Sequence, residues 1–370
     1  MLEGTRVNVN VRAIAKNKLV KTLLGLALLL PLASCGVFAK SSGIDEPGAG
    51  RTLARIRDKR ILTCGSNSQL PGFGKRDELG NYSGFDVDIC RAIAAAVFGV
   101  PDVAADGEDV EYVYLQAADR KDALAAGTID VMSRNTTWTL TRDRDWQATY
   151  GPTTYYDGQG FMVRQASGIQ TVADLNGRSV CVIRGTTTEA NLEETFAARN
   201  LALTSVKFDD NDASASAYDR GECDALTSDQ STLISRRSTM GNPGEHAILS
   251  ETISKEPLGP LVKQGDSQWA DVVRWTVNAL IYAEEMGITS KNVEEMRSSS
   301  NPEIRRFLGA EGNLGELLDV EMEPDWAYAV ISTVGNYGEI FERNLGPLGV
   351  ERGLNQPHAQ GGIMYAQPFR

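Results

Sequence analysis

The stretch VEYVYLQAADRKDALAAGTIDVMSRNTT, residues 110–137, decides the fold class of this chain. Its first seven residues are rich in Val and Tyr, which is typical of a strand. Residues 118–128 predict a helix that ends at Gly127, because glycine accepts the left-handed backbone that closes many helices. Residues 129–137 predict a second strand. A strand, a helix and another strand in direct succession indicate a mostly parallel α/β sheet.

The same alternation extends to both sides of this stretch. Upstream, residues 60–66 (RILTCGS) predict a short strand, and residues 84–99 (GFDVDICRAIAAAVFG) predict a helix with apolar side chains at helical spacing. Downstream, residues of about 166–255 form a second, smaller α/β unit inserted into the first. Its expected helices and strands cover residues 171–185, 186–200, 203–208, 211–222 and 223–229. The C-terminal part is mainly helical, with helices expected in residues 268–287, 301–309 and 324–346.

The N-terminal residues 1–34 are typical of a secretory signal, because basic residues precede the apolar run LLGLALLLPLAS, residues 23–34. This run is shorter than the roughly 20 apolar residues that a membrane-spanning helix needs. The sequence LASCG resembles the bacterial lipobox, which implies that Cys35 is lipidated and becomes the N-terminus. A plain cleavable signal is the alternative. Residues 35–50 are then interpreted as the lipidated cysteine and a flexible tether.

The charge of the chain argues against nucleic acid as a partner. Lys and Arg number 37 and Asp and Glu number 49, which gives a formal net charge of −12. No basic stripe offsets this excess, so polyanions are repelled. With two histidines and no Cys-x-x-Cys spacing, the sequence favours neither a zinc site nor a histidine-based catalytic triad, and we expect no metal and no cofactor.

Four cysteines remain after Cys35, an even number that suits an oxidising compartment. We favour the pairs Cys64–Cys90 and Cys181–Cys223, because each pair then falls within one of the two α/β units. Buried free thiols are the alternative.

Five stretches in this order resemble the solute-binding proteins of bacterial ABC transporters for polar amino acids. They are PGFGKRDELGNYSGFDVDICRAIAAAV (71–97), GTIDVMSRNTTWTLTRD (127–143), YYDGQGFMVR (155–164), CVIRGTTTE (181–189) and CDALTSDQS (223–231). The general L-amino-acid-binding branch is the most similar, and the resemblance covers nearly all of residues 60–370. The sequence departs from the family in YGPTTYY (150–156), where the family usually has Phe-Ser-x-Pro-Tyr.

The resemblance implies a two-lobed periplasmic-binding-protein fold of the α/β class, type II-like, with a helical C-terminal extension. Lobe one is expected to comprise residues 51–164 plus 257–370, and lobe two residues 165–256. Two crossing hinge segments, expected near residues 163–167 and 254–262, would let the lobes close on a ligand.

The resemblance also implies a site on lobe one for a free amino acid, which carries a carboxylate and an ammonium. Arg142, in the Thr-x-x-Arg of residues 139–142, is the expected donor fork for the carboxylate. Thr137 adds a hydroxyl, and the backbone around Asn135 adds a carbonyl for the ammonium. The alternative for Arg142 is a surface ion pair with a neighbouring aspartate, and Arg144 is expected to be solvated. Phe73 is expected to pack on the aliphatic part of the ligand, with lobe packing as its alternative.

Lobe two is expected to complete this site. The backbone N–H groups of Gly185 and Thr186 lie where a helix starts, and helix N-termini favour anions such as the carboxylate. Asp229, at the end of a strand, is expected to accept from the ammonium, since ligands of open α/β sheets bind at strand carboxyl ends. A helix cap is the alternative role of Asp229.

These features together predict an extracytoplasmic receptor that closes on free L-amino acids and delivers them to an ABC permease. We expect a monomer without catalytic residues, held by its lipid anchor in the periplasm or at the outer face of the cytoplasmic membrane. The alternatives are a dehydratase-like enzyme on the same scaffold and a ligand-sensing domain. The first needs an additional base in the cleft, and the second needs a downstream membrane span.

Overall fold

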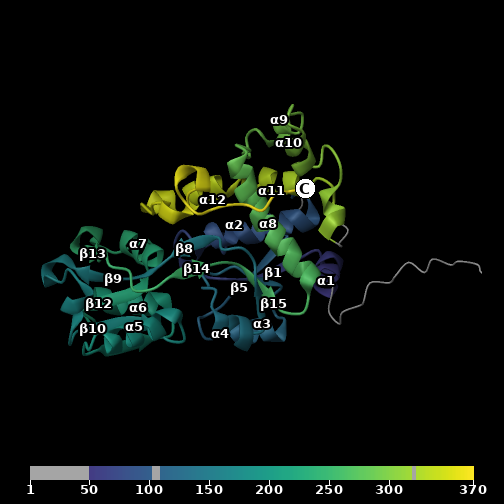
Figure 1. Cartoon of the computed structure of the whole chain (residues 1–370). Helices are drawn as coiled ribbons and strands as arrows, with labels where there is room; N and C mark the ends of the chain where they lie inside the picture. Colours follow the sequence, from purple (N-terminus) through teal and green to yellow (C-terminus); the bar gives the residue numbers. More distant parts are fainter. Residues whose placement is uncertain (1–49, 102–108, 319–321) are drawn as a thin grey trace, which may run out of the picture. The chain divides into compact units, whose positions relative to one another are not determined.

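The computed structural model describes residues 50–101, 109–318 and 322–370 (Figure 1). The predicted signal sequence, the lipidation of Cys35 and the tether as far as residue 49 lie outside the described residues. Among the helices that are described, none combines the length and the apolar character needed to cross a membrane.

The first sheet has five strands in the order β5–β1–β6–β15–β7. β1 pairs in parallel with β5 and β6, as predicted, while β15 pairs antiparallel with β6 and β7. The bounds are β1 Leu62–Ser66, β5 Val110–Tyr114, β6 Val131–Met132, β7 Ala148–Tyr150 and β15 Leu261–Lys263. The strand predicted over residues 129–137 is shorter than expected. Its polar end leaves the sheet because Ser133 and Asn135 form hydrogen bonds to the side chain of Asp86 instead.

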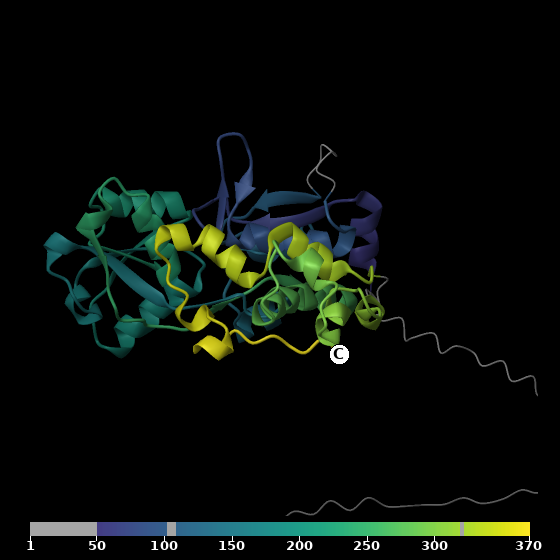
Figure 2. The same ribbon diagram turned by 90° about the horizontal axis from the view of Figure 1, so that it is seen from above.

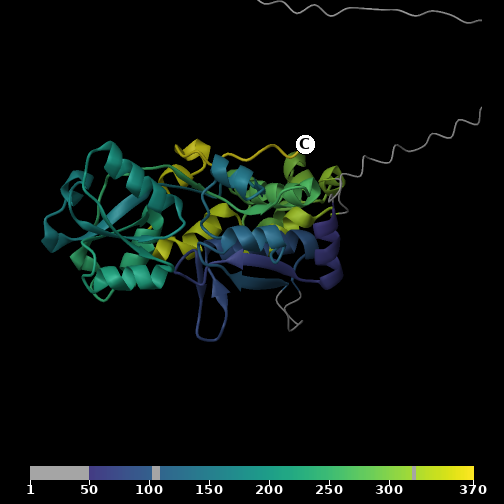
Figure 3. The ribbon, with the colours of Figure 1, turned by 90° about the horizontal axis from the view of Figure 1, so that it is seen from below.

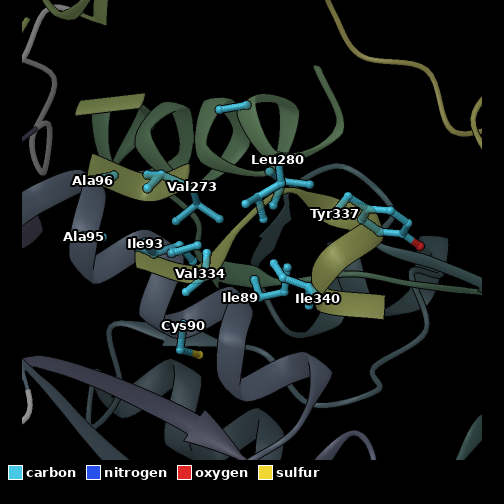
Figure 4. Packing of buried hydrophobic residues seen from close by; sticks show 14 of the residues in the cluster. Ile89, Cys90, Ile93, Ala95, Ala96, Val273, Leu280, Val334, Tyr337 and Ile340 are labelled. Atoms are coloured by element: carbon cyan, nitrogen blue, oxygen red, sulfur yellow. The ribbon is translucent and has the colours of Figure 1, made fainter. Parts of the chain in front are cut away.

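Side chains on opposite faces of this sheet enter two different hydrophobic clusters. Val131 and Val262 face a large cluster completed by helices α1, α2, α8, α11 and α12. Met132 and Leu261 face a smaller cluster that contains Leu124 of helix α3. Figure 4 shows part of the large cluster, with side chains of α2, α8, α11 and α12 directed toward one another.

The helices of this lobe largely follow the predictions. Helix α3 ends at Gly127, whose φ of 67° is the left-handed cap that the sequence predicts. The helix predicted over residues 324–346 is divided in two, because Gly335 takes a φ of 80° and Asn336 starts a new helix with a capping box. The bounds are α1 Arg51–Lys59, α2 Phe85–Phe98, α3 Arg120–Ala126, α4 Leu140–Asp145, α8 Ser267–Glu285, α9 Val293–Met296, α10 Pro302–Phe307, α11 Trp326–Val334 and α12 Tyr337–Asn344.

The second sheet also has five strands, in the order β11–β10–β12–β9–β13. Val180 and Val182 of β10 pack with Phe196 of helix α5, whereas Cys181 between them packs with residues of helices α6 and α7 on the other face. The bounds are β9 Gln159–Arg164, β10 Ser179–Ile183, β11 Thr204–Phe208, β12 Ala225–Asp229, β13 His246–Ile248, α5 Thr187–Ala198, α6 Asn211–Asp219 and α7 Gln230–Ser238.

Two short strands connect the sheets. β8 (Tyr155–Asp157) leads from the first sheet to the second, and β14 (Glu256–Leu258) leads back and pairs antiparallel with β8. The first crossing therefore comes before the predicted residues 163–167, and the lobe boundary after residue 164 needs correction. The reason is that β9 is a strand of the second sheet, where Phe161 and Val163 fill the hydrophobic core.

Both favoured disulfides are present, so the alternative of free thiols at these positions is wrong. Cys64–Cys90 links β1 to α2, and Cys181–Cys223 links β10 to the residues just before β12. Each bridge thus lies within one α/β unit, as expected for these pairs.

The C-terminal segment turns back after α12 and runs toward α8, which Figure 2 shows in yellow and green. On its way, the side chain of Asn355 accepts a hydrogen bond from the backbone N–H of Tyr156 at 2.6 Å and donates one to its carbonyl at 3.1 Å. At the end of the chain, Phe369 packs against the rings of Trp275 and Tyr282, with centroids 5.1 Å and 5.0 Å away. The segment therefore binds both the hinge strand β8 and the core of lobe one.

A third, small sheet joins strands β2, β3 and β4 in an antiparallel meander. The bounds are β2 Gln69–Leu70, β3 Gly74–Arg76 and β4 Tyr82–Ser83. The β3–β4 hairpin extends away from the helices in Figure 3.

Candidate ligand-binding site

A small polar cavity is lined by residues of both sheets and their helices. Asn135, Thr137 and Arg142 line it from the first α/β unit, and Thr186 and Asp229 line it from the second. The structure thus brings together five of the seven residues that the sequence predicts for a ligand site. Its volume is ≈ 40 Å³.

Arg142 is placed by the short helix α4. Thr139 caps this helix by accepting a hydrogen bond from the Arg142 N–H at 3.2 Å. The guanidinium is buried, donates to the carbonyl oxygen of Thr137 at 2.7 Å and lies over the ring of Trp146. Among the described residues, no carboxylate lies within 4.0 Å of it. The alternative of a surface ion pair is wrong, and the exposed Arg144 is the arginine that pairs with Asp145.

Two further arginines, which the sequence interpretation missed, line the same cavity. Arg120 is 2% exposed and Arg134 is 5% exposed. Arg120 donates to the carbonyl oxygen of Ala117 at 3.0 Å and to Thr136 Oγ1 at 3.3 Å. Burial lowers the pKa of Arg134 to about 10, and burial together with Arg142 and Arg134 lowers the pKa of Arg120 well below its usual value. Arg134 lies within residues 127–143, one of the stretches that carry the family resemblance, so an arginine in that stretch was the available signal.

Asp229 ends β12 and precedes helix α7. Asp229 occupies the N-cap position of that helix, but its side chain makes no capping hydrogen bond, so the alternative role as a side-chain cap is wrong. The carboxyl group is 6% exposed, and we find no hydrogen-bond donor for it among the described residues. Burial, followed by the nearby Asp157 and Glu256, raises the pKa of Asp229 well above its usual value, while Arg142 acts in the opposite direction. A cation beside this group would restore its ionised form.

Thr186 starts helix α5, and its side chain accepts a hydrogen bond from the N–H of Glu189 at 3.1 Å. Three consecutive threonines at this helix start, residues 186–188, line the cavity. Gly185 does not line it, and its N–H donates to the Glu189 carboxylate at 2.6 Å. Gly185 therefore lacks a free amide for a ligand carboxylate, contrary to the expectation.

Asn135 contributes an unpartnered acceptor. Its φ is 23°, and its N–H donates to Asp86 Oδ2 at 2.8 Å. The side-chain Oδ1 is buried without a hydrogen-bond partner among the described residues. Because an unsatisfied buried oxygen is costly, this atom is suited to a ligand donor. Asn135 thus offers its side-chain oxygen to a ligand, in addition to the backbone carbonyl that the sequence predicts.

Glu256, on the hinge strand β14, contacts residues that line the cavity, and the sequence did not reveal it. It is almost fully buried and accepts hydrogen bonds from Thr137 Oγ1 at 2.5 Å and from Thr187 Oγ1 at 2.9 Å. Thr137 belongs to the first α/β unit and Thr187 to the second. Asn191 of α5 also donates to Glu256, at 2.7 Å. The carboxylate thereby links both units next to the cavity.

Phe73 lies elsewhere. Its ring is 1% exposed and packs edge-on against Phe85 and Tyr155, with centroids 6.1 Å and 5.6 Å away. It is a core residue of lobe one and does not line the cavity. Phe73 therefore packs within the lobe, which was its alternative role, and does not reach the cavity. Within the described ranges, no group of three His, Cys, Asp or Glu side chains is arranged to hold a metal ion.

Comparison with known proteins identifies close relatives. The chain is 48% identical to the general L-amino acid-binding periplasmic protein of Rhizobium johnstonii, over 96% of this chain and 100% of the relative. It is 44% identical to the glutamate/glutamine/aspartate/asparagine-binding protein of Rhodobacter capsulatus, over 90% of this chain and 98% of that protein. Both relatives are named as amino-acid-binding proteins.

Comparison with solved structures finds the same class of protein. A solved ABC transporter periplasmic binding protein from Brucella ovis, with glutathione bound, matches with a TM-score of 0.82 and 48% identity, covering 86% of this chain and 99% of that one. The predicted two-lobed α/β fold with a helical C-terminal region is confirmed. Residues 62–292 match the family of bacterial extracellular solute-binding proteins, family 3. This chain therefore belongs to the bacterial extracellular solute-binding proteins of family 3.

Proposed function

We propose that this protein is an extracytoplasmic receptor that binds free L-amino acids and delivers them to the permease of an ABC transporter. One observation carries the proposal: buried Arg142 and buried Asp229 line one cavity from opposite lobes, and neither has an ion-pair partner among the described residues. A zwitterionic amino acid offers each of them the opposite charge. The names of the relatives support the same ligand class.

Binding would join the two lobes through the ligand. In the proposal, the ligand carboxylate accepts hydrogen bonds from the Arg142 guanidinium and from the N-terminus of α5 at Thr186. The ammonium donates to the Asp229 carboxylate and to Asn135 Oδ1. Charge-assisted hydrogen bonds contribute roughly 1.5–3 kcal/mol each. Only the arrangement in which the lobes meet makes all of them, so the ligand shifts the open–closed equilibrium toward closure.

The hinge strands β8 and β14 are the proposed pivot of this motion. In the proposal, they divide the chain into a lobe of about residues 51–157 plus 257–370 and a lobe of residues 158–256, a division that the pairing of β9 with β12 supports. The hydrogen bonds of Glu256 to Thr137 and Thr187 then hold the closed arrangement beside the ligand. A permease would recognise this closed shape.

The N-terminal motif and the names of the relatives support a proposal about where the protein is located. We propose a periplasmic location, with Cys35 lipidated and residues 35–50 as the tether to the outer face of the cytoplasmic membrane. We also propose that the protein is a monomer and that it releases its ligand chemically unchanged, and the names of the relatives as binding proteins support the second point. Replacing Cys35 with Ser should move the protein from the membrane fraction to the soluble fraction, and retention in the membrane would contradict the anchor.

A thermal-shift screen of the purified protein tests the ligand class. The panel holds the twenty amino acids, glutathione, simple sugars and organic acids. A ligand at 100 times its Kd should add about 2.7 kcal/mol of stability, which is readily seen as a higher unfolding temperature. The proposal predicts that amino acids produce the shift. If only sugars or organic acids without an amino group produce it, the proposed function is wrong.

A further inference from the structure

Three guanidinium groups gather around the one small cavity. Arg120, Arg134 and Arg142 are all more than nine-tenths buried, and all three line it. None of them lies within 4.0 Å of a carboxylate of any described residue. Asp229 is the single carboxylic acid on the same lining. The cavity therefore carries an excess of positive charge that an ordinary zwitterion leaves unbalanced.

Arg134 is the arginine with the most unused binding capacity. Its Nε donates to the carbonyl oxygen of Leu115 at 2.8 Å, which fixes the direction of the side chain. Its two terminal nitrogens have no hydrogen-bond acceptor among the described residues. A guanidinium held in this way presents two parallel donors, the arrangement that matches a carboxylate. Arg120 is anchored similarly, through its Nε and one terminal nitrogen.

Asp86 and Asp119 lie near enough to influence Arg134, but among the described residues no acid forms an ion pair with it. Asp86 attracts Arg134 electrostatically, but its carboxylate is occupied by the N–H of Asn135 at 2.8 Å and by Ser133 Oγ at 3.4 Å. Burying an uncompensated cation is expensive, so an anion that enters the cavity gains a large electrostatic benefit. The ligand's α-carboxylate supplies one negative charge, which the proposed function assigns to Arg142.

We propose that Arg134, supported by Arg120, binds a second carboxylate on the ligand's side chain, so that the site selects acidic amino acids. This inference rests on the proposed function and adds a specificity-determining residue to it. Arg142 and Asp229 grip the part that all amino acids share, whereas Arg134 and Arg120 distinguish one side chain from another. Neutral amino acids still bind, but they leave the second guanidinium pair without a partner.

The test compares three ligands by titration calorimetry: glutamate, its neutral isostere glutamine, and serine, which is too short to reach a distant subsite. The variant is Arg134→Gln, which removes the charge but keeps a polar side chain. The matched control is Arg144→Gln, because Arg144 is exposed and pairs only with Asp145. The expected loss of glutamate affinity in Arg134→Gln is roughly 10- to 150-fold, the effect of one charge-assisted interaction. Serine affinity should change by less than about threefold, and the control should bind all three like the wild type.

The outcomes separate the two proposals. If the wild type binds none of the three ligands or any other amino acid, the proposed function fails. If it binds amino acids but Arg134→Gln weakens glutamate and serine equally, Arg134 has a structural role and the inference fails. An unchanged preference for glutamate over glutamine in the variant overturns it as well. Binding of serine by Arg134→Gln at near wild-type affinity shows that the variant is folded.

Discussion

Replacing Arg142 with Ala should nearly abolish amino-acid binding. One nitrogen of the guanidinium donates to the carbonyl of Thr137, at 2.7 Å, and the Tyr150 hydroxyl also interacts with the guanidinium, which leaves further N–H groups for a ligand. A ligand carboxylate held by two of them makes two charge-assisted hydrogen bonds of roughly 1.5–3 kcal/mol each. Their loss amounts to about 3–6 kcal/mol, or roughly a 150- to 25,000-fold increase in Kd.

The ligand-free protein should tolerate this change. The variant loses the hydrogen bond to Thr137, but it also removes a buried cation that has no ion-pair partner among the described residues, and these two effects oppose each other. The expected change in the free energy of unfolding is within about 1.5 kcal/mol, a typical effect of a single mutation. Arg144→Ala is the matched control, because that side chain is 76% exposed and a surface pair contributes little.

Titration calorimetry and thermal unfolding of the ligand-free variants together decide the question. The assignment requires weak or absent binding in Arg142→Ala, normal binding in Arg144→Ala and similar unfolding of both. Binding by Arg142→Ala within about threefold of the wild type would refute the reasoning. A variant that unfolds before it can be titrated would show that Arg142 holds the fold of α4 instead.

Three further changes have defined outcomes. Because burial raises the pKa of Asp229, ligand binding should release a proton from its carboxyl group, and affinity should fall as the pH is lowered below that pKa. Calorimetry from about pH 4 to pH 8 should show this pH dependence of the affinity in the wild type but not in Asp229→Asn. Equal pH dependence in both proteins would exclude Asp229 as the acceptor for the ammonium. Replacing both Cys181 and Cys223 with Ser should lower the free energy of unfolding by about 4 kcal/mol, because the bridge restricts the unfolded chain over a sequence separation of 42 residues. Unfolding in urea measures this change, and a value below about 1 kcal/mol would contradict the loss of chain entropy as the source of the stability. Asn355→Ala should lower the free energy of unfolding by about 1–3 kcal/mol in the same assay, because the backbone N–H and carbonyl of Tyr156 both lose their hydrogen bonds to Asn355. An unchanged midpoint of urea unfolding would show that this contact is dispensable.

The elements of the fold were predictable where local signals are strong. Gly127 ends helix α3 because its left-handed conformation is a local property, visible in the sequence. The position of the first crossing was not predictable in this way. Residues 159–164 are apolar enough for either sheet, and only their pairing with β12 assigns them to the second one.

The candidate site was predictable where a motif fixes the geometry. Arg142 follows its cap Thr139 by one helical turn, so local structure places it in the cavity. Phe73 shows the limit of this reasoning, since a phenylalanine beside glycines suits a core as well as a cleft, and only the neighbouring rings decide. Arg120 was missed for a related reason. At the start of an amphipathic helix, an arginine is typical of a solvated face, and its burial depends on packing between distant segments.

The packing of Phe369 determines when lobe one is able to fold. Its ring completes a cluster with Trp275 and Tyr282, and helix α2 from the beginning of the same lobe belongs to that core. The core of lobe one therefore combines segments from both ends of the described residues, whereas lobe two is one continuous segment, residues 158–256. During synthesis lobe two is able to fold before lobe one, and this delay in lobe one favours the proposed export of the chain in an unfolded state.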